Sequence, residues 1–287
     1  MTGLKRLKLV VVTLLAVFFL CAWRFAFPDK RATDDEKVVQ ARIVLTVSEG
    51  KRLIARAVAQ MPIITQAMKN GTVIVARGTT NTYVAEELLG TKIPHGAYVA
   101  GRVYPEKGGK RLADVNTIKD IVLVNGQWRQ DLSLAQAVRM LKPGDVVIKG
   151  ANALDYDNKL AAVIVGSSNG GTTGEILPYV GARKAHLVIP VGLEKQVAGD
   201  VIDIVRKMRE PVDSLNRIPT MFLLTGKIVT ELEAIEQLAS VSAFQAAAGG
   251  IGGAEGAVWL ICRGPRAKVE AALKLAEQIQ GEPAFVQ

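Results

Sequence analysis

The segment RGTTNT, Arg77 to Thr82, carries residue types well suited to hold an anion. It follows an apolar strand, Thr72 to Ala76, and precedes a helix that ends at Gly90. At such a strand-to-helix turn, free backbone N–H groups and the helix N-terminus favour negative charge. The pattern predicts a phosphate site, although a Thr-rich helix cap without a ligand fits the same residues. The predicted ligand-binding residues of this loop are Arg77, Gly78, Thr79, Thr80, Asn81 and Thr82.

Two further polar loops also follow apolar strands. KGANALD, Lys149 to Asp155, follows the strand Asp145 to Ile148, and GSSNGGTTGE, Gly166 to Glu175, follows the strand Ala161 to Val165. Ligands of parallel α/β sheets bind at the carboxyl ends of the strands. We therefore expect these loops to contribute further ligand contacts, from Gly150, Asn152, Gly170, Gly171 and Thr172.

Apolar strands alternate with amphipathic helices along the body of the chain. Ser48 and Ser133 are expected to cap two of the helices. The strands continue to His186 to Pro190, and one more is expected near Tyr98 to Tyr104. Uniformly apolar strands separated by helices predict an α/β fold with a mostly parallel sheet that helices cover on both faces.

The order of these motifs resembles that of a known superfamily. A strand-GTT-helix, a strand-xGANxxD, a strand followed by a Gly-rich loop and Glu, and the strand HLVIPVGLEK follow one another over about residues 45 to 195. This set is similar to the superfamily that unites ribose-5-phosphate isomerase, glucosamine-6-phosphate deaminase and CoA transferases. GTTNTYVAEEL is also similar to the GTTT segment in the effector domain of DeoR-type sugar regulators. The resemblance implies a domain that binds a small phosphorylated sugar-like or acyl metabolite.

The chain departs from the isomerase pattern at its acids. Ribose-5-phosphate isomerases carry a DGADE segment whose acids take part in proton transfer, and then a KGGGGA loop with its lysine and a nearby glutamate. Here the acids correspond to Lys149, Asn152 and Ala153, and the lysine falls near Val165. Only Glu175 has a counterpart. The chain is therefore not expected to be a working ribose-5-phosphate isomerase, and it shows no equivalent of the CoA-transferase glutamate motif.

A rearranged catalytic site is still conceivable from the residues. A 1,2-proton shift needs a base at the substrate carbon and a group that stabilises the enediolate. Glu175 is the candidate base and Lys149 the candidate electrophile. Alternatively, Glu175 only interacts favourably with the N-terminal dipole of its own helix, and Lys149 lies on a solvated loop tip.

Residues 220 to 287 predict a small α+β domain, with a ferredoxin-like arrangement as one option. Strands Met221 to Thr225, Val241 to Ala247 and Ala257 to Arg263 are expected, with two helices. The loop GGIGGAEG, residues 249 to 256, lies between two strands, which favours a hairpin over a nucleotide site. The domain could form a homo-oligomer or cover the ligand of the first domain.

Residues 1 to 40 predict a membrane anchor followed by a charged linker. Fifteen uncharged residues, Leu9 to Trp23, follow a basic start. They rise only about 22 Å as a helix, so spanning a core of roughly 30 Å requires residues 4 to 27 and a snorkelling Arg24. A single uncleaved signal anchor, with the body leaning to the cytoplasmic side, fits this pattern. The alternatives are a cleaved signal peptide, or a start codon assigned too early for a cytoplasmic protein that begins near Val38.

The net charge of +9 belongs mostly to this N-terminal part. Residues 1 to 60 carry eleven Lys and Arg against five acids, and the rest of the chain carries 25 against 22. No nucleic-acid partner is expected, because the body lacks a concentrated basic face. Cys21 and Cys262 lie far apart, and His95 and His186 are the only histidines. No metal site, disulfide framework or cofactor is therefore expected.

These observations predict three parts: the anchor and linker, an isomerase/CoA-transferase-like α/β domain over residues 41 to 219, and the small α+β domain. The expected function is binding, and in the enzymatic reading isomerase-type conversion, of the phosphorylated metabolite. The alternative is a non-catalytic membrane-associated metabolite sensor or scaffold. Turnover of a bound sugar phosphate would separate the two.

Overall fold

The structure is a computed structural model that describes residues 37 to 108 and 117 to 285. All helices and strands named below belong to one structural unit that begins at Val38. The predicted membrane anchor, residues 4 to 27, lies outside the described residues. Among the helices that are described, none combines the length and the apolar composition needed to cross a bilayer.

A mixed six-stranded sheet forms the centre of this unit, in the order β10-β8-β5-β2-β3-β4. The first four strands are parallel, and β3 and β4 continue the sheet in antiparallel pairing. The four parallel strands are short and almost wholly buried, as expected for strands with helices on both faces. The bounds are β2 Thr72–Val75, β3 Ile121–Val124, β4 Gln127–Trp128, β5 Val146–Ile148, β8 His186–Pro190 and β10 Lys227–Val229.

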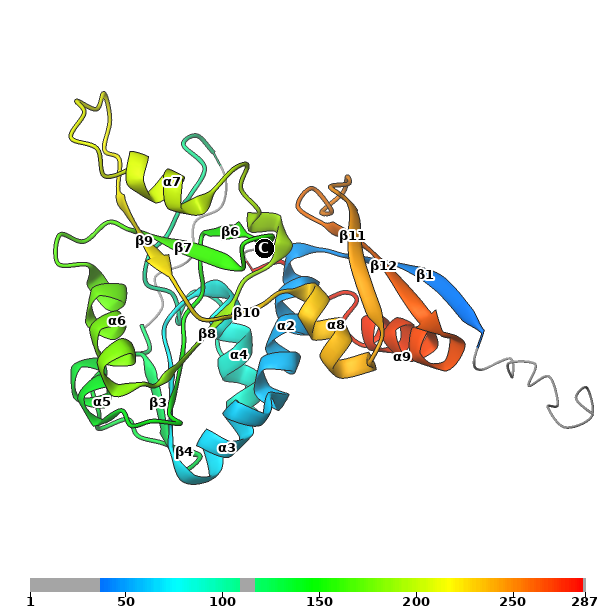
Figure 1. The fold of residues 1–287 in the computed structure, drawn as a ribbon, viewed down its shortest axis with the longest axis horizontal. Helices are drawn as coiled ribbons and strands as arrows, with labels where there is room; N and C mark the ends of the chain where they lie inside the picture. The colour runs from blue at the N-terminus through cyan, green and yellow to red at the C-terminus, as the bar shows by residue number, and fades with distance from the viewer. Residues whose placement is uncertain (1–36, 109–116, 286–287) are drawn as a thin grey trace, which may run out of the picture. The chain divides into compact units, whose positions relative to one another are not determined.

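Helices cover both faces of this sheet (Figure 1). One group packs around α2, which contacts both α4 and α8, and the other group consists of α5 and α6, which contact each other. The fold is thus mixed α/β, as predicted. The bounds are α2 Val47–Gln60, α3 Pro62–Asn70, α4 Thr79–Leu89, α5 Leu134–Met140, α6 Gly171–Arg183 and α8 Glu231–Ala239.

A separate antiparallel sheet, β6-β7-β9, interrupts the alternation between β5 and β8. Its strands are β6 (Ala153–Asp155), β7 (Leu160–Val165) and β9 (Thr220–Leu224), and helix α7 (Val201–Lys207) packs on it. The expectation that Ala161 to Val165 joins the parallel sheet is therefore wrong. Apolar β7 is buried because α7 and β9 cover it, so its composition imitates that of a parallel strand.

A third sheet, β1-β12-β11, joins the two ends of the described chain. Strand β1 (Val38–Leu45) pairs along its whole length with β12 (Val258–Pro265), and β12 pairs with β11 (Ser242–Ala248). Helices α8 and α9 (Arg266–Glu277) contact this sheet. The predicted hairpin around residues 249 to 256 is confirmed. The predicted strand at Met221 to Thr225 instead lies in the β6-β7-β9 sheet, as β9.

Two local predictions need correction. Helix α2 is capped by Thr46, not Ser48, because Thr46 and Glu49 form a reciprocal capping box. No strand forms at Tyr98 to Tyr104. There the Tyr98 hydroxyl enters the sheet edge, where it donates to the carbonyl of Val75 and accepts the N–H of Ile121 at 2.9 Å.

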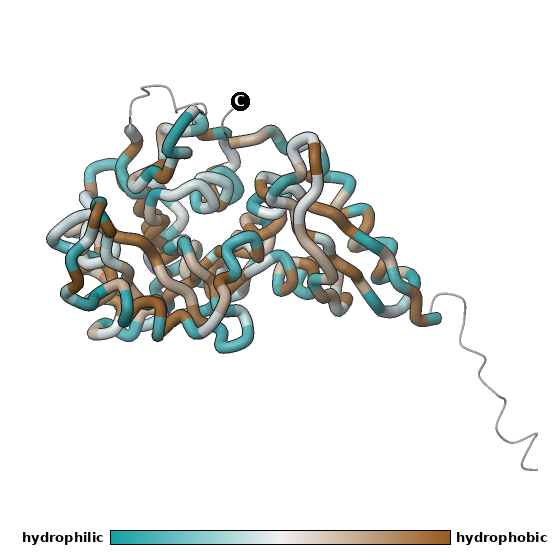
Figure 2. Tube along the Cα trace, turned by 90° about the horizontal axis from the view of Figure 1, so that it is seen from above, coloured by the Kyte–Doolittle hydropathy of each residue, from teal (hydrophilic) through white to brown (hydrophobic). Residues whose placement is uncertain are grey.

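The predicted boundaries at Ser133 and Gly90 are confirmed. Ser133 forms a capping box with Gln136 at the start of α5. Gly90 ends α4 with φ of 65°, a left-handed conformation that favours glycine. Figure 2 colours the trace by hydropathy and shows hydrophobic and hydrophilic stretches alternating along the chain. The largest hydrophobic cluster contains residues of α2 and of all three sheets.

Candidate functional site

The turn between β2 and α4 leaves backbone donors free, as the sequence predicted. Gly78 precedes α4 without a capping side chain. Within the described residues, the N–H groups of Thr79, Thr80 and Asn81 make no hydrogen bond. The hydroxyl of Thr82 is not available, because it donates to the carbonyl of Gly78 at 2.9 Å. Three free donors at a helix N-terminus can hold an anion.

Asn81 joins this turn to the end of β5. Its Nδ2 donates to the carbonyls of Ala76 at 2.6 Å and Ile148 at 3.2 Å, which fixes the orientation of the amide. Its Oδ1 is buried and has no partner among the described residues, and the Oγ1 of Thr80 is in the same state. A Cβ on Gly150 would lie 3.8 Å from Asn81 Oδ1. The structure therefore brings the predicted loop at Arg77 to Thr82 together with Gly150.

Arg77 forms an ion pair with Asp120, but its buried Nε has no hydrogen-bond partner among the described residues. Its Nε lies 3.4 Å from Oδ2 of Asp120, and Asp120 Oδ1 accepts the backbone N–H of Arg77 at 2.9 Å. The two residues line a cavity of about 370 Å³ together with residues 117 to 119, 133 and 134. Arg77 therefore brings its positive charge to this cavity together with the negative charge of Asp120.

Three lysines gather at the same edge of the sheet. Lys149 follows β5, Lys195 ends the short 3-10 helix Leu193–Lys195 after β8, and Lys51 lies in the first turns of α2. Lys51 and Lys149 are each 8% exposed, and Lys195 is half-buried. In the part of the chain that the structure describes, none of the three forms an ion pair with a carboxylate. We call these three residues the lysine cluster.

Burial without ion pairs makes these ammonium groups weak bases. Burial, reinforced by the charge of Lys195, lowers the pKa of both Lys51 and Lys149 to about 8. Burial likewise lowers the pKa of Lys195. Since Lys195 affects both of the others, it is the common neighbour of the cluster. Amines of this kind are partly neutral near physiological pH, which is needed for proton transfer or nucleophilic attack.

Two glutamates lie beside the lysines. Glu231 begins α8, is 2% exposed, and accepts the N–H of Leu193 at 2.9 Å. Burial and the neighbouring charge of Glu194 raise the pKa of Glu231. One oxygen of Glu194, Oε1, is buried without a partner among the described residues. Both carboxylates are close enough to Lys51 and Lys195 to affect the pKa of each.

Glycine allows the carboxylates to approach so closely. A Cβ on Gly192 would lie 1.8 Å from Oε2 of Glu194 and 3.0 Å from Oε1 of Glu231, and a Cβ on Gly50 would lie 2.5 Å from the same Glu231 oxygen. Any larger residue at Gly192 would displace a carboxylate. The chain therefore has glycine at the two positions where backbone meets the acid pair.

The remaining predicted site residues lie apart from the lysine cluster. Gly170, Gly171, Thr172 and Glu175 belong to the start of α6, which follows β7 and contacts α5. Within the described residues, no hydrogen bond or ion pair joins Glu175 to a lysine of the cluster. Asn152 is engaged elsewhere, because its Oδ1 accepts the N–H of Ile164 at 3.0 Å. Of the two predicted catalytic residues, only Lys149 lies in the cluster.

Sequence reasoning missed four members of this site, because they come from separate segments that look ordinary. Lys51 lies on an amphipathic helix, and Glu231 looks like a favourable acid at a helix start. A usable signal was present: Thr230-Glu231 come directly after a strand, as Lys149 does, and Glu194-Lys195 follow another strand after three intervening residues. Charged residues that follow parallel strands meet at one edge of the sheet.

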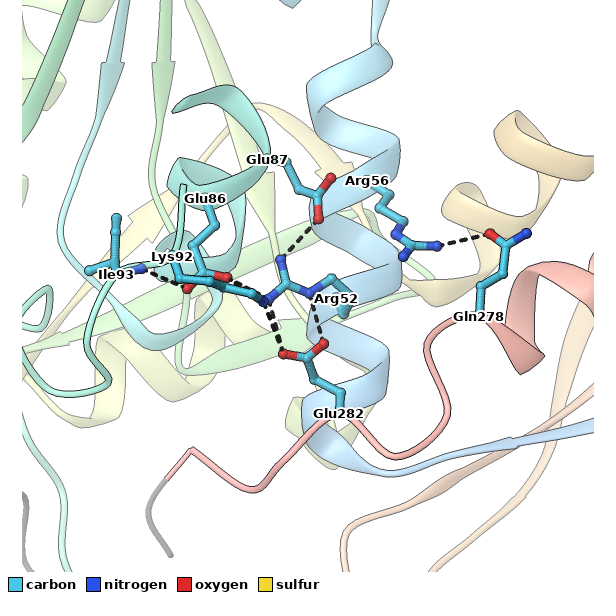
Figure 3. A network of polar contacts seen from close by, with 8 residues as sticks. All are labelled: Arg52, Arg56, Glu86, Glu87, Lys92, Ile93, Gln278 and Glu282. Carbon is cyan, nitrogen blue, oxygen red and sulfur yellow. Dashed lines mark hydrogen bonds and ion pairs between the residues drawn. The ribbon is translucent and has the colours of Figure 1, made fainter. Parts of the chain in front are cut away.

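A second buried charge cluster lies one residue further along α2. Arg52 is 3% exposed and pairs with three carboxylates, those of Glu86, Glu87 at 2.9 Å and Glu282 at 2.9 Å (Figure 3). Lys92 adds an ion pair to Glu86 at 3.2 Å. We call these five residues the arginine cluster. Hydrogen bonds to Glu282 and Glu86 hold the pKa of Arg52 above its usual value although burial opposes this, so the cluster joins α2, α4 and the C-terminal segment.

The described residues contain no group of three or more His, Cys, Asp or Glu side chains arranged to hold a metal ion. Compared with family models, curated proteins and solved structures, the chain matches none of them.

Proposed function

We propose that the carboxyl edge of the six-stranded sheet binds, and converts by isomerase-type proton transfer, a small phosphorylated sugar-like or acyl metabolite. One observation carries this proposal: three lysines without ion pairs lie at the same sheet edge as the free N–H groups of α4. Buried ammonium groups are costly unless an anion compensates them, so a fixed cluster of them favours an anionic ligand.

The residues divide into binding and proton-transfer roles. Lys195 and the N–H groups of Thr79 and Thr80 hold the anionic group. Glu231 has a raised pKa and lies beside the lysines, so it is better placed than Glu175 to move a proton. Lys149 stabilises negative charge on the reacting oxygen.

The fold is compatible with the resemblance on which the proposal also draws. Four parallel strands have helices on both faces, and the three-stranded sheet β1-β12-β11 carries two helices. We further propose that residues 4 to 27 anchor the protein in a membrane with the body on the cytoplasmic side. A homo-oligomer is compatible with this arrangement.

Binding can be tested by calorimetry with inorganic phosphate and a panel of sugar phosphates. A charge-assisted contact contributes about 1.5 to 3 kcal/mol, so Lys195→Met should weaken binding about tenfold or more. Thr80→Val should do the same if its hydroxyl contacts the ligand. Lys227→Met removes an exposed lysine of the same sheet and is the matched control. Equal affinity in parent and Lys195→Met, with both folded, would exclude the site.

Measuring turnover of a bound metabolite distinguishes an enzyme from a non-catalytic sensor. Within the described residues, no hydrogen bond or ion pair joins the predicted catalytic partners Glu175 and Lys149, which is the observation that favours a non-catalytic sensor. Proton NMR in D2O should show exchange of a carbon-bound proton of the bound metabolite, lost in Glu231→Gln and retained in Glu175→Gln. Ribose and ribulose 5-phosphates should not interconvert. Binding without any exchange would establish the sensor instead.

A further inference from the structure

We infer that Lys149 is a nucleophile that condenses with the carbonyl group of an anionic aldehyde or ketone and forms an imine. This inference rests on the proposed function, since the lysine cluster must first bind the anionic group of the same molecule. It narrows the ligand class to carbonyl compounds that carry a phosphate or carboxylate. It also gives Lys149 a covalent role in place of a purely electrostatic one.

Lys149 occupies the point of the sheet where the chain reverses its direction of winding. From β2 the chain continues to β3 on one side and later returns to β5 on the other, with α4 and α5 on opposite faces. Crevices at such points are where open α/β sheets bind ligands. Asn81 spans this crevice, and its unpartnered Oδ1 lies beside Gly150, the residue next to Lys149.

The Lys149 amine is only weakly engaged. Its Nζ donates one hydrogen bond, a 3.3 Å contact to the carbonyl of Gly150. Lys195 makes a shorter bond, 2.8 Å, to the carbonyl of Ala151. Lys51 faces the ring of Phe285 at 5.9 Å and has two carboxylates, Glu194 and Glu231, that stabilise its charge.

The one acid that stabilises the charge of Lys149 is already paired. Asp120 favours the ammonium form of Lys149, but it also holds the guanidinium and the N–H of Arg77. Burial and Lys195 act in the opposite direction and dominate. A substantial fraction of Lys149 is therefore the neutral amine near pH 8, and only the neutral amine can attack a carbonyl.

The reaction balances with groups that the site contains. The neutral Nζ adds to the carbonyl carbon, and the carbonyl oxygen takes a proton from the Lys195 ammonium, giving a carbinolamine. A proton on the carbinolamine nitrogen moves to the hydroxyl group, which leaves as water, so that a protonated imine remains beside neutral Lys195. Lys195 then takes a proton from solvent by way of Glu231 and Glu194, which lie beside it. Hydrolysis reverses the step, so no oxidant or reductant is needed. The imine also acidifies the neighbouring carbon, which the proton transfer proposed above requires.

Reductive trapping tests this inference on the full chain. The protein is incubated with glyceraldehyde 3-phosphate, dihydroxyacetone phosphate or pyruvate and then treated with cyanoborohydride, and the adduct is located by peptide mass spectrometry. We expect one adduct, on Lys149, at least tenfold more abundant than on Lys92, whose side chain is 75% exposed. Labelling should increase with pH around a midpoint near 8.

Variants and a binding measurement decide between the outcomes. Lys149→Arg and Lys149→Met should abolish the adduct, while Lys92→Met should leave it unchanged, each with a cooperative thermal transition. Labelling spread over exposed lysines, or unchanged in folded Lys149→Arg, would overturn the inference. Calorimetry with the same compounds, without reductant, distinguishes the two proposals. Binding without an adduct refutes the imine and leaves the proposed function, whereas no binding refutes the proposed function itself.

Discussion

Lys51 and Arg52 are neighbours on α2, yet they experience opposite surroundings. Arg52 faces three carboxylates and donates hydrogen bonds to all of them (Figure 3). Lys51 lies near Lys195 and the acid pair Glu194 and Glu231, and forms no ion pair among the described residues. Both side chains are less than 10% exposed. Burial alone therefore does not distinguish the two regions, but compensation of charge does.

The difference shows what each region can do. A buried cation that meets its full set of acceptors has a raised pKa and behaves as a structural connection. A buried cation without such acceptors has a lowered pKa and remains able to bind an anion or to lose its proton. The arginine cluster thus holds the fold together, and the lysine cluster is the candidate for chemistry.

Breaking the arginine cluster should have the largest effect. Arg52→Met leaves the acids of Glu86, Glu87 and Glu282 buried or half-buried without their cation, which should destabilise the protein by about 3 to 5 kcal/mol. Urea denaturation measures this loss. Arg56→Met is the matched control, because Arg56 makes one exposed hydrogen bond, to Gln278. If both variants unfold at the same urea concentration, the arginine cluster is not a structural connection.

The lysine cluster should make the protein more stable as the pH rises from about 8 to about 10.5. The pKa of Lys149 is about 8 when folded and about 10.5 when unfolded, so between these values the unfolded chain binds more protons. Stability therefore rises over this interval, by about 2 to 4 kcal/mol for a shift of this size. The penalty is fully present below pH 8. The quantity to measure is the free energy of unfolding of the parent minus that of Lys149→Met, at pH 7 and at pH 10.5.

If this difference in the free energy of unfolding is the same at both pH values, Lys149 is solvated or paired in the folded state. Arg52→Met is not expected to alter this pH dependence, since arginine stays protonated throughout the range. The pH experiment thereby tests the two clusters separately.

Crowding the acid pair should have a smaller effect. Gly192→Ala places a Cβ where the Glu194 and Glu231 carboxylates lie, and overpacking of this kind costs about 1 to 3 kcal/mol. Because the displaced acids lie beside the lysine cluster and Glu231 is the proposed proton carrier, proton exchange on the ligand should fall more than affinity. Gly101→Ala, which meets no atom within 4 Å, is the control. Full exchange activity in Gly192→Ala would mean that the acid pair moves no proton.

The smallest effect is expected at the periphery of the arginine cluster. Lys92 is 75% exposed, although it pairs with Glu86 at 3.2 Å. Exposed ion pairs contribute about 0 to 1 kcal/mol, so Lys92→Met should hardly move the urea midpoint. A loss as large as that of Arg52→Met would show that the cluster acts as one network rather than through its buried cation.

Local sequence patterns predicted local structure well. The turn from β2 into α4, the capping box at Ser133, the left-handed Gly90 and the β11-β12 hairpin each follow from a few adjacent residues. The same patterns could not assign β7 to its sheet, because an apolar strand covered by α7 has the composition of a parallel strand. They also predicted a strand at Tyr98, whose hydroxyl instead forms hydrogen bonds with the backbone of both β2 and β3.

The candidate site was predicted only where one segment carries it. The free donors of the loop at Arg77 to Thr82 depend on a single turn, so they were found. The lysine cluster depends on how β5, β8 and α2 pack together. These elements are far apart in the sequence, so no local pattern predicts their contact. The sequence points to Glu175 because it follows a Gly-rich loop, whereas the place of Glu231 beside the lysines depends on the pairing of β10 with β8.

The pairing of β1 with β12 has a consequence for how the chain folds. Residue 38 pairs with residue 265, so the first of the described strands to be synthesised pairs with the last of them. Contacts this distant in sequence slow folding, and β1 stays without its partner until β12 has been synthesised. During that interval the exposed strand is open to association with other chains, and its pairing with β12 is the late step that ends the exposure.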